Sequence, residues 1–166
     1  MKINDMLVKL VEYGPIIIVI IMYLEGLNMS GIPSVVIMPA IGVYISITGR
    51  SFLYIFAIAL IASILGNLTY YLIASKLGDV IYRKIAEKMP SMKKTIDKAM
   101  RMIEKYGNKA CFIGRILPGA RTFVSLVSGI FKISLKDFLI YSSLGIAVWN
   151  FNLTILGYLV ANFSLN

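Results

Sequence analysis

The stretch that decides the fold runs from residue 114 to residue 122 and reads GRILPGART. It places Arg115 and Arg121 six residues apart, on either side of a proline-glycine pair. Apolar residues precede and follow this stretch, and an arginine inside a membrane helix costs roughly 2.5–3.5 kcal/mol. A turn at the proline-glycine pair would bring both guanidinium groups to one end of a helical hairpin, where they could grip one anion. The alternative is structural: arginines that pair with carbonyl groups or with an acid, or that reach the membrane interface.

The composition indicates an integral membrane protein. The chain has 166 residues, of which 58% are hydrophobic, and a formal net charge of +9. Soluble nucleic-acid binders are also basic but far less apolar, so we expect no nucleic-acid partner. There is no histidine and one cysteine, Cys111. This excludes an internal disulfide, a zinc site and His- or Cys-based catalysis, so we expect no enzyme, metal or cofactor.

Hydropathy and proline spacing predict an all-α fold with one membrane domain over residues 1–166. The uncharged run 51–75 would measure roughly 37 Å as a helix, enough to span a bilayer. Pro33 and Pro39 interrupt the preceding apolar block, which favours a re-entrant hairpin over a kinked span. The expected order is an N-terminal membrane helix (1–25), a re-entrant hairpin (26–49), a transmembrane helix (51–75), a basic section (76–109), a second re-entrant hairpin (110–131) and a last transmembrane helix (135–163).

Weak internal similarity indicates an inverted repeat. Ile32-Pro33 matches Leu117-Pro118 about 85 residues later, and Asn67 in an Asn-Leu-Thr triplet matches a second triplet at the same spacing. Each repeat would be a hairpin followed by a transmembrane helix, with the two hairpins entering from opposite faces. In this scheme the two helices begin at polar caps, Ser51 and Asp137. Chance similarity between apolar segments is the alternative.

The section 76–109 is strongly basic, with ten Lys/Arg residues and four acidic residues. The positive-inside rule places it in the cytoplasm, on one side of a multi-pass membrane protein. Apolar residues recur in this section at helical spacing, opposite a lysine- and arginine-rich face; they are Met92, Ile96, Ala99, Met100 and Ile103. This amphipathic helix either lies on the membrane or packs on the cytoplasmic side of the protein itself.

Other polar residues could complete the site. Thr122 follows the second arginine, where helix amides could bind an anion beside Pro118 and Gly119. Glu25 ends the first apolar run and is the candidate proton-binding counter-charge, or else an interfacial or structural carboxylate. Four further candidates either line a cavity or join helices through hydrogen bonds: Asn67, Tyr70, Ser125 and Asn150. Trp149 is either an interface anchor or a cavity wall.

At these residues the chain resembles the DedA family, also called the SNARE-associated or VTT-domain superfamily. The stretch 114–123 follows the family signature G-R-F-x-P-x-x-R-T closely, and the likeness extends from about residue 13 to residue 158. The resemblance implies two opposed re-entrant hairpins and transport of a lipid phosphate, notably undecaprenyl phosphate, with coupling to ion gradients proposed for the family. By motif position, Arg115 and Arg121 would bind the substrate phosphate and Glu25 would be the first membrane acid.

The chain departs from the family at two acidic positions. Val35 stands where many members have an acid, and Asn67 stands where many have an aspartate. A relay of several carboxylates is therefore not expected, and Glu25 is the remaining acid of the two predicted hairpins. The leading hypothesis is a flippase for a polyprenyl phosphate, with or without ion coupling, in a chain that could form homo-oligomers. The alternative is a phospholipid scramblase or phospholipid transporter without strict coupling; a lipid-phosphate enzyme and a passive accessory subunit are more remote.

Overall fold

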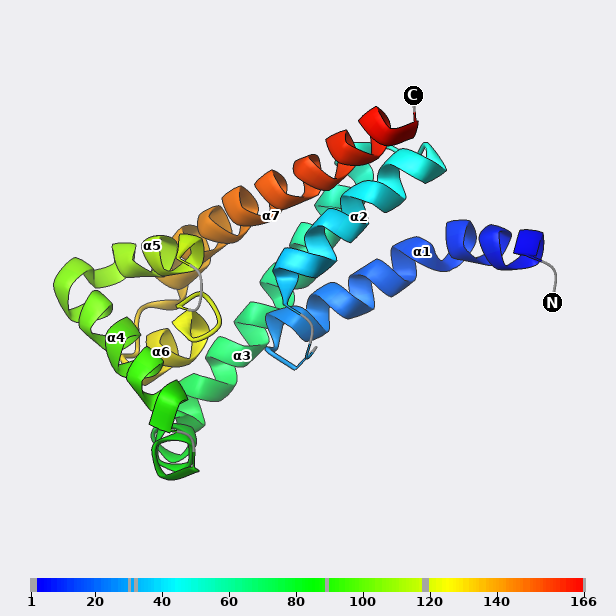
Figure 1. Cartoon of the computed structure of the whole chain (residues 1–166). Helices are drawn as coiled ribbons and strands as arrows, with labels where there is room; N and C mark the ends of the chain where they lie inside the picture. Colours follow the sequence, from blue (N-terminus) through cyan, green and yellow to red (C-terminus); the bar gives the residue numbers. More distant parts are fainter. Residues whose placement is uncertain (1–2, 30, 32, 89, 118–119, 166) are drawn as a thin grey trace. The chain divides into compact units, whose positions relative to one another are not determined.

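The computed structural model describes residues 3–29, 31, 33–88, 90–117 and 120–165, and these residues form helices, turns and no β-strand (Figure 1). The helices are α1 (Ile3–Gly26), α2 (Ser34–Thr48), α3 (Phe52–Lys88), α4 (Pro90–Tyr106), the short 3₁₀ helix η1 (Gly107–Lys109), α5 (Ala110–Ile116), α6 (Val124–Ile130) and α7 (Leu135–Leu165). The all-α class predicted from the sequence is confirmed for these residues.

The chain divides into two compact units. The first unit contains the residues up to Gly66 and those from Asn150 onward, and the second contains Asn67–Trp149. Helix α3 therefore contributes its first part to the first unit and its remainder to the second, and α7 does the reverse. The inverted repeat and the re-entrant course of the hairpins stay predictions.

In the first unit, α2 packs closely on the last part of α7. A side chain at Gly42 would overlap the backbone of α7 at Thr154, and one at Gly157 would overlap the backbone of α2 at Pro39. Small residues permit such close approach between membrane helices. The core around this contact includes Met22 from α1, which is fully buried.

The region predicted as the first hairpin, 26–49, contains one long helix rather than two short limbs. Helix α2 continues through Pro39, and the chain turns before it, after the end of α1. A proline inside a helix leaves the carbonyl four residues earlier without its usual donor. The backbone of Pro39 lies directly against Gly157 of α7, where a Cβ would overlap its carbonyl.

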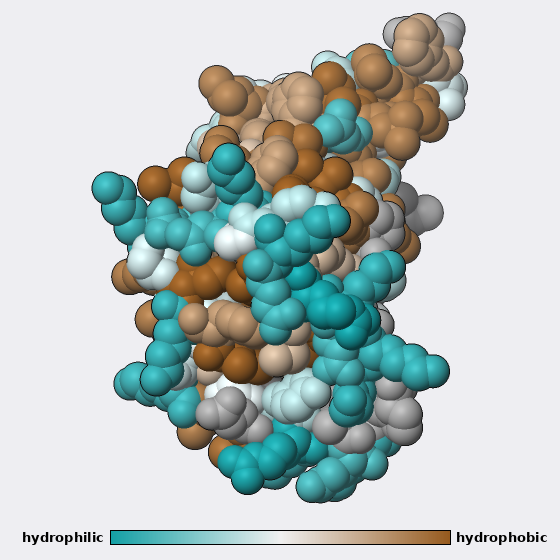
Figure 2. Space-filling model, turned by 90° about the vertical axis from the view of Figure 1, so that its left-hand side faces the viewer, coloured by the Kyte–Doolittle hydropathy of each residue, from teal (hydrophilic) through white to brown (hydrophobic). Residues whose placement is uncertain are grey.

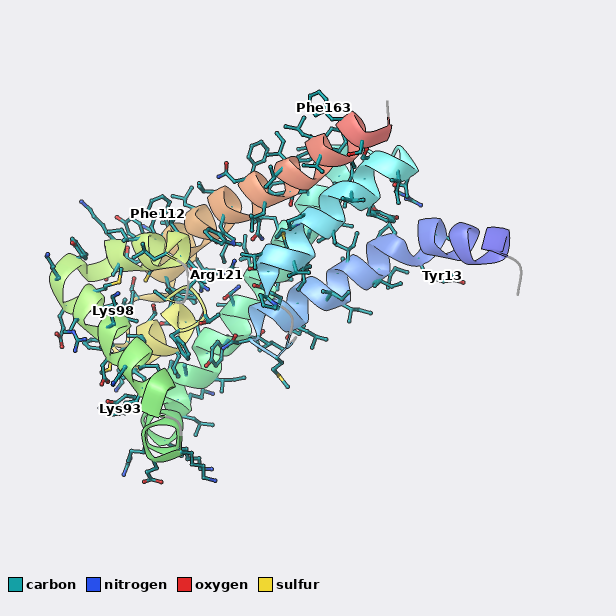
Figure 3. All side chains as sticks on the ribbon, in the orientation of Figure 1. Tyr13, Lys93, Lys98, Phe112, Arg121 and Phe163 are labelled. Carbon is teal, nitrogen blue, oxygen red and sulfur yellow. The ribbon has the colours of Figure 1, made fainter. Side chains whose placement is uncertain are left out.

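In the second unit, α4 is the amphipathic helix that the sequence predicts. Its apolar face, with Ile96, Ala99 and Ile103 buried, packs in a core shared with α5, α6 and the last part of α3. Of the two alternatives, packing of this face on the protein itself is therefore the one observed. The side chain of Met92 lies outside the described residues. Hydrophilic side chains cover the outer face (Figure 2), and the labelled Lys93 projects outward from α4 (Figure 3).

Two helices are long and apolar enough to cross a membrane among the described residues. The stretches are Phe52–Gly78 in α3 and Leu135–Ser164 in α7. Ser51 caps α3 as expected, because its hydroxyl accepts the N–H of Tyr54 at 3.4 Å. The cap of α7 is Ser134 rather than the predicted Asp137, which lies three residues further on and accepts the Ser134 hydroxyl at 2.7 Å. The Ser134 hydroxyl in turn accepts the backbone N–H of Asp137 at 3.2 Å, the hydrogen bond of a helix N-cap.

Candidate anion site at the α5–α6 turn

The site lies where α5 ends and α6 begins. Leu117 leaves the helix in an extended conformation, at φ −83° and ψ 123°, as expected of a residue that precedes proline. Its carbonyl accepts the backbone N–H of Arg121 at 3.3 Å, which closes the turn. Pro118 and Gly119 lie outside the described residues. The two short helices contact each other and α4 on either side of this turn.

Arg115 is buried, with 4% of its surface exposed, and its guanidinium is bound by the protein. Nε donates to the hydroxyl of Ser142 at 2.8 Å, and Nη2 donates to the hydroxyl of Ser125 at 2.6 Å. Nη1 donates across the turn to the carbonyl of Arg121 at 3.0 Å. These three acceptors are neutral and fix the orientation of the guanidinium. Part of the structural alternative is therefore observed: Arg115 does pair with a carbonyl group.

A second hydrogen bond links this arginine to α3. The hydroxyl of Ser125, which accepts from Arg115, donates to Oδ1 of Asn67 at 3.1 Å. All three side chains are buried. Gly145 of α7 makes room for the group, because a Cβ at that position would lie 2.6 Å from the Cβ of Arg115. Asn67 thus joins helices through hydrogen bonds.

Arg121 is also buried, with 9% of its surface exposed, and its guanidinium contacts an aromatic ring. Its guanidinium carbon lies 5.3 Å from the ring centre of Trp149, a cation–π contact. The indole Nε1 of this tryptophan is buried and has no hydrogen-bond partner among the described residues. A buried N–H beside a cationic group is a donor that an anionic ligand could satisfy.

The other predicted residues are divided between the two units. Thr122 is exposed in the turn, and Tyr70 is half-buried against the core of the second unit. Asn150 is fully buried, and Glu25 is half-buried at the end of α1; both belong to the first unit. The pairing of Glu25 with the arginines stays a prediction.

Sequence reasoning missed Ser142. This residue lies in an apolar run, 27 residues after the arginine whose Nε it accepts. The available signal was its position three residues before Gly145, since a small residue on the same helix face often marks a close helix contact. Within the described part of the chain, no group of three or more His, Cys, Asp or Glu residues could hold a metal ion.

Comparison with known proteins places this site in a family. The model of the VTT domain matches residues 32–159, a stretch that contains the whole α5–α6 turn and most of α7. The chain belongs to the VTT-domain family. The comparison with solved structures found no match.

Among VTT-domain relatives, the chain is similar to "Undecaprenyl phosphate transporter A" of Staphylococcus aureus, with 31% identity over 150 residues that cover 88% of this chain and 73% of the relative. An uncharacterized membrane protein of Buchnera aphidicola is 24% identical over 82% of this chain and 54% of its own length. "Protein DedA" of Escherichia coli strain K12 is 33% identical over 63 residues, which cover 38% of this chain and 29% of that protein. Some relatives are thus much longer than this chain. Membrane relatives and two apolar spans together identify a helical membrane protein.

Proposed function

We propose that this protein is a flippase that moves a polyprenyl phosphate, undecaprenyl phosphate, across the bacterial cytoplasmic membrane. The phosphate binds at the α5–α6 turn of the second unit, and the isoprenoid tail stays in the lipid. The turn residues Pro118, Gly119 and Thr122 would bring backbone and hydroxyl groups to the same ligand. The Staphylococcus aureus relative, named as a transporter of this lipid, supports the choice of substrate.

The observation that carries the proposal is a pair of buried arginines on either side of the α5–α6 turn. Arg115 donates to two hydroxyls and a carbonyl, and Arg121 stacks on Trp149. A negative ligand stabilises buried arginines in an apolar chain, because charges are poorly screened in a medium of low dielectric. The fixed guanidinium of Arg115 orients the turn, and Arg121 with the unpartnered indole N–H offers donors to a phosphate oxygen.

The topology and the driving force are part of the same proposal. The basic section 76–109 lies in the cytoplasm, where its outward lysines meet anionic head groups. Glu25 acts as the titrating counter-charge that helps to release the phosphate, with or without coupling to an ion gradient. The protein forms homo-oligomers or acts alone; either state is compatible with this site, because the residues at the α5–α6 turn all come from one chain.

A second function, phospholipid scrambling without ion coupling, is favoured by one observation. Asn67 replaces a carboxylate expected from the family resemblance, and its amide oxygen is used by the hydroxyl of Ser125 at 3.1 Å. A neutral amide in this position cannot exchange protons near neutral pH. Transport that ignores pH and voltage gradients, and accepts phosphatidylethanolamine as well as undecaprenyl phosphate, would favour this function over the first.

The test is reconstitution of the full chain in proteoliposomes with labelled undecaprenyl phosphate. We expect R121A to reduce transport at least about 10-fold, the effect of losing a charged hydrogen bond of 1.5–3 kcal/mol. R121K keeps the charge but loses the bidentate fork, so it should retain intermediate activity. R115A should also abolish transport, and circular dichroism will show whether it still folds.

The matched control is R101A. Arg101 lies in the same unit, exposed on α4, and its loss removes an equal charge without touching the turn. Transport by R101A should equal that of the parent chain. Undiminished transport by a folded R121A protein would refute the assignment of the site.

A further inference from the structure

In the first unit, α2 and the last part of α7 run in the same direction with a constant register. The hydroxyl of Thr154 donates to Sδ of Met38 at 3.6 Å, and the hydroxyl of Ser46 donates to Oδ1 of Asn162 at 2.6 Å. Both pairs are separated by 116 residues along the chain. Gly42 contacts α7 between these two levels, so the register holds along the whole contact.

The same register, extended by one turn, brings Asn150 to the level of Ser34, the first residue of α2. Both side chains are buried, and Asn150 is 1% exposed. Side chains on a helix tilt toward its N-terminus. Because α2 and α7 are parallel here, this tilt would carry the amide of Asn150 toward the N-terminal end of α2.

The amide of Asn150 is unusual because it is buried and unsatisfied. Neither its nitrogen nor its oxygen has a hydrogen-bond partner among the described residues. A buried polar group without a partner is destabilising, and native proteins rarely retain one without a ligand or an ordered water. The position therefore calls for a ligand with both an acceptor and a donor.

The N-terminus of α2 supplies a second attraction for an anion. This 15-residue helix begins after Pro33, which makes no side-chain cap, and its first turn has no acidic residue. The backbone N–H groups of Val36 and Ile37 both donate hydrogen bonds to the carbonyl of Pro33. The N-terminal end of a helix carries a partial positive charge and attracts phosphate groups.

The second unit contains a comparable pairing of helix start and asparagine. Ser125, the second residue of α6, donates to Asn67 of α3, and Gly129 packs on α3 further along in the same direction. There the asparagine is satisfied by the serine. In the first unit, by contrast, the buried amide of Asn150 has no hydrogen-bond partner among the described residues.

We propose that the N-terminus of α2 and the amide of Asn150 form a second phosphate-binding position, carried by the first unit. The amide nitrogen donates to an anionic oxygen, and the amide oxygen accepts from a protonated one. A phosphate monoester and inorganic phosphate carry both kinds of oxygen near neutral pH, whereas a phosphodiester has no P–OH group. The lipid form of this ligand rests on the proposed function, since the transported lipid would be the monoester.

The test is titration calorimetry on the purified full chain in phosphate-free detergent micelles. The probes are inorganic phosphate, undecaprenyl phosphate and phosphatidylglycerol, which is a diester. The background is R121A, which removes the guanidinium that would bind phosphate at the α5–α6 turn. We expect saturable binding of a phosphate monoester or inorganic phosphate, and about 10-fold or greater weakening of it by N150L.

Substitutions of Val35 supply an independent pair of variants. Val35 is 50% exposed in the first turn of α2, so V35D should fold, and its negative charge should repel the phosphate. V35N, the neutral isostere, should keep binding. N150L should also raise the melting temperature of the phosphate-free protein, because it removes an unsatisfied buried amide.

The outcomes separate the ligand sources and the two proposals. Asn150-dependent binding of inorganic phosphate identifies free phosphate as sufficient, and such binding of undecaprenyl phosphate alone identifies the lipid as the source. If phosphatidylglycerol binds equally well, the proposed preference for a phosphate monoester is wrong. If neither N150L nor V35D changes phosphate binding, the proposed site is wrong. If R115A and R121A leave transport unchanged, the proposed function is wrong. Phosphate binding that depends on Asn150 would still support the second phosphate-binding position in that case.

Discussion

Ser125 connects the buried arginine of the α5–α6 turn to α3, and its removal should destabilise the second unit. In S125A, Nη2 of Arg115 loses an acceptor at 2.6 Å and Oδ1 of Asn67 loses a donor at 3.1 Å. A bond from a charged group contributes roughly 1.5–3 kcal/mol and a neutral one about 1 kcal/mol, so the expected loss is about 3 kcal/mol. Since Ser125 has 0% exposure, surrounding water cannot readily replace its hydroxyl.

Thermal unfolding in micelles measures this loss directly. For a chain of this size, about 3 kcal/mol corresponds to a fall in Tm of about 6–12 °C. The chain has one tryptophan, Trp149, whose ring stacks on Arg121 beside the turn. Its fluorescence therefore reports on the unit in which the bond is broken.

The matched control is S75A. The hydroxyl of Ser75 donates to the carbonyl of Leu72 at 2.8 Å within the same helix, so its loss should change stability by less than about 0.5 kcal/mol. The double variant S125A/N67A should lose less than the sum of the single losses, because the two side chains share one bond. If S125A unfolds within 1 °C of S75A, the hydroxyl does not support the arginine and the reasoning fails.

Three further predictions concern neighbouring features. G129V should destabilise the second unit by about 1–3 kcal/mol, seen as earlier thermal unfolding, because a Cβ there would lie 2.7 Å from the backbone of α3; parental stability would contradict that contact. W149F should weaken the hold on Arg121 by about 0.5–2 kcal/mol and raise the KM for lipid transport, and an unchanged KM would show that the indole N–H does not meet the substrate. The side-chain hydrogen bond from Lys93, at 2.9 Å, is the main cause that lowers the pKa of Asp97 from its ordinary value of 3.8. The Asp97 carboxylate therefore contributes its full stabilisation at pH values above 3.8, and this stabilisation is lost as the pH falls through the lowered pKa. Carbon NMR should show this pKa rising in K93M, and a titration that is the same in both proteins would exclude the ion pair as its cause.

Local chemistry was enough to predict much of the fold. The uncharged run 51–75 predicts a spanning helix, and α3 does contain such a stretch. The same reasoning ends the segment too early, since α3 continues to Lys88. Hydropathy marks where a helix leaves an apolar medium, whereas alanine, lysine and glutamate favour helix in water as well.

Long-range contacts account for what the sequence could not predict. The arginine pair was visible in a short motif, but the hydroxyl of Ser142 reaches Arg115 only because α7 passes beside α5. The close approach of α7 to α2 at Pro39 likewise depends on Gly157, more than a hundred residues away. Nothing local to Asn150 indicates that its amide would be buried without a partner.

The glycine contacts between α2 and α7 have a mechanical consequence. Where Gly42 and Gly157 meet backbone, there are no side-chain rotamers that could readjust if one helix slid or rolled against the other. The last part of α7 must then move together with α2 as one rigid body in any transport cycle. A covalent tether between positions 46 and 162, already joined by a 2.6 Å hydrogen bond, would leave such a cycle running.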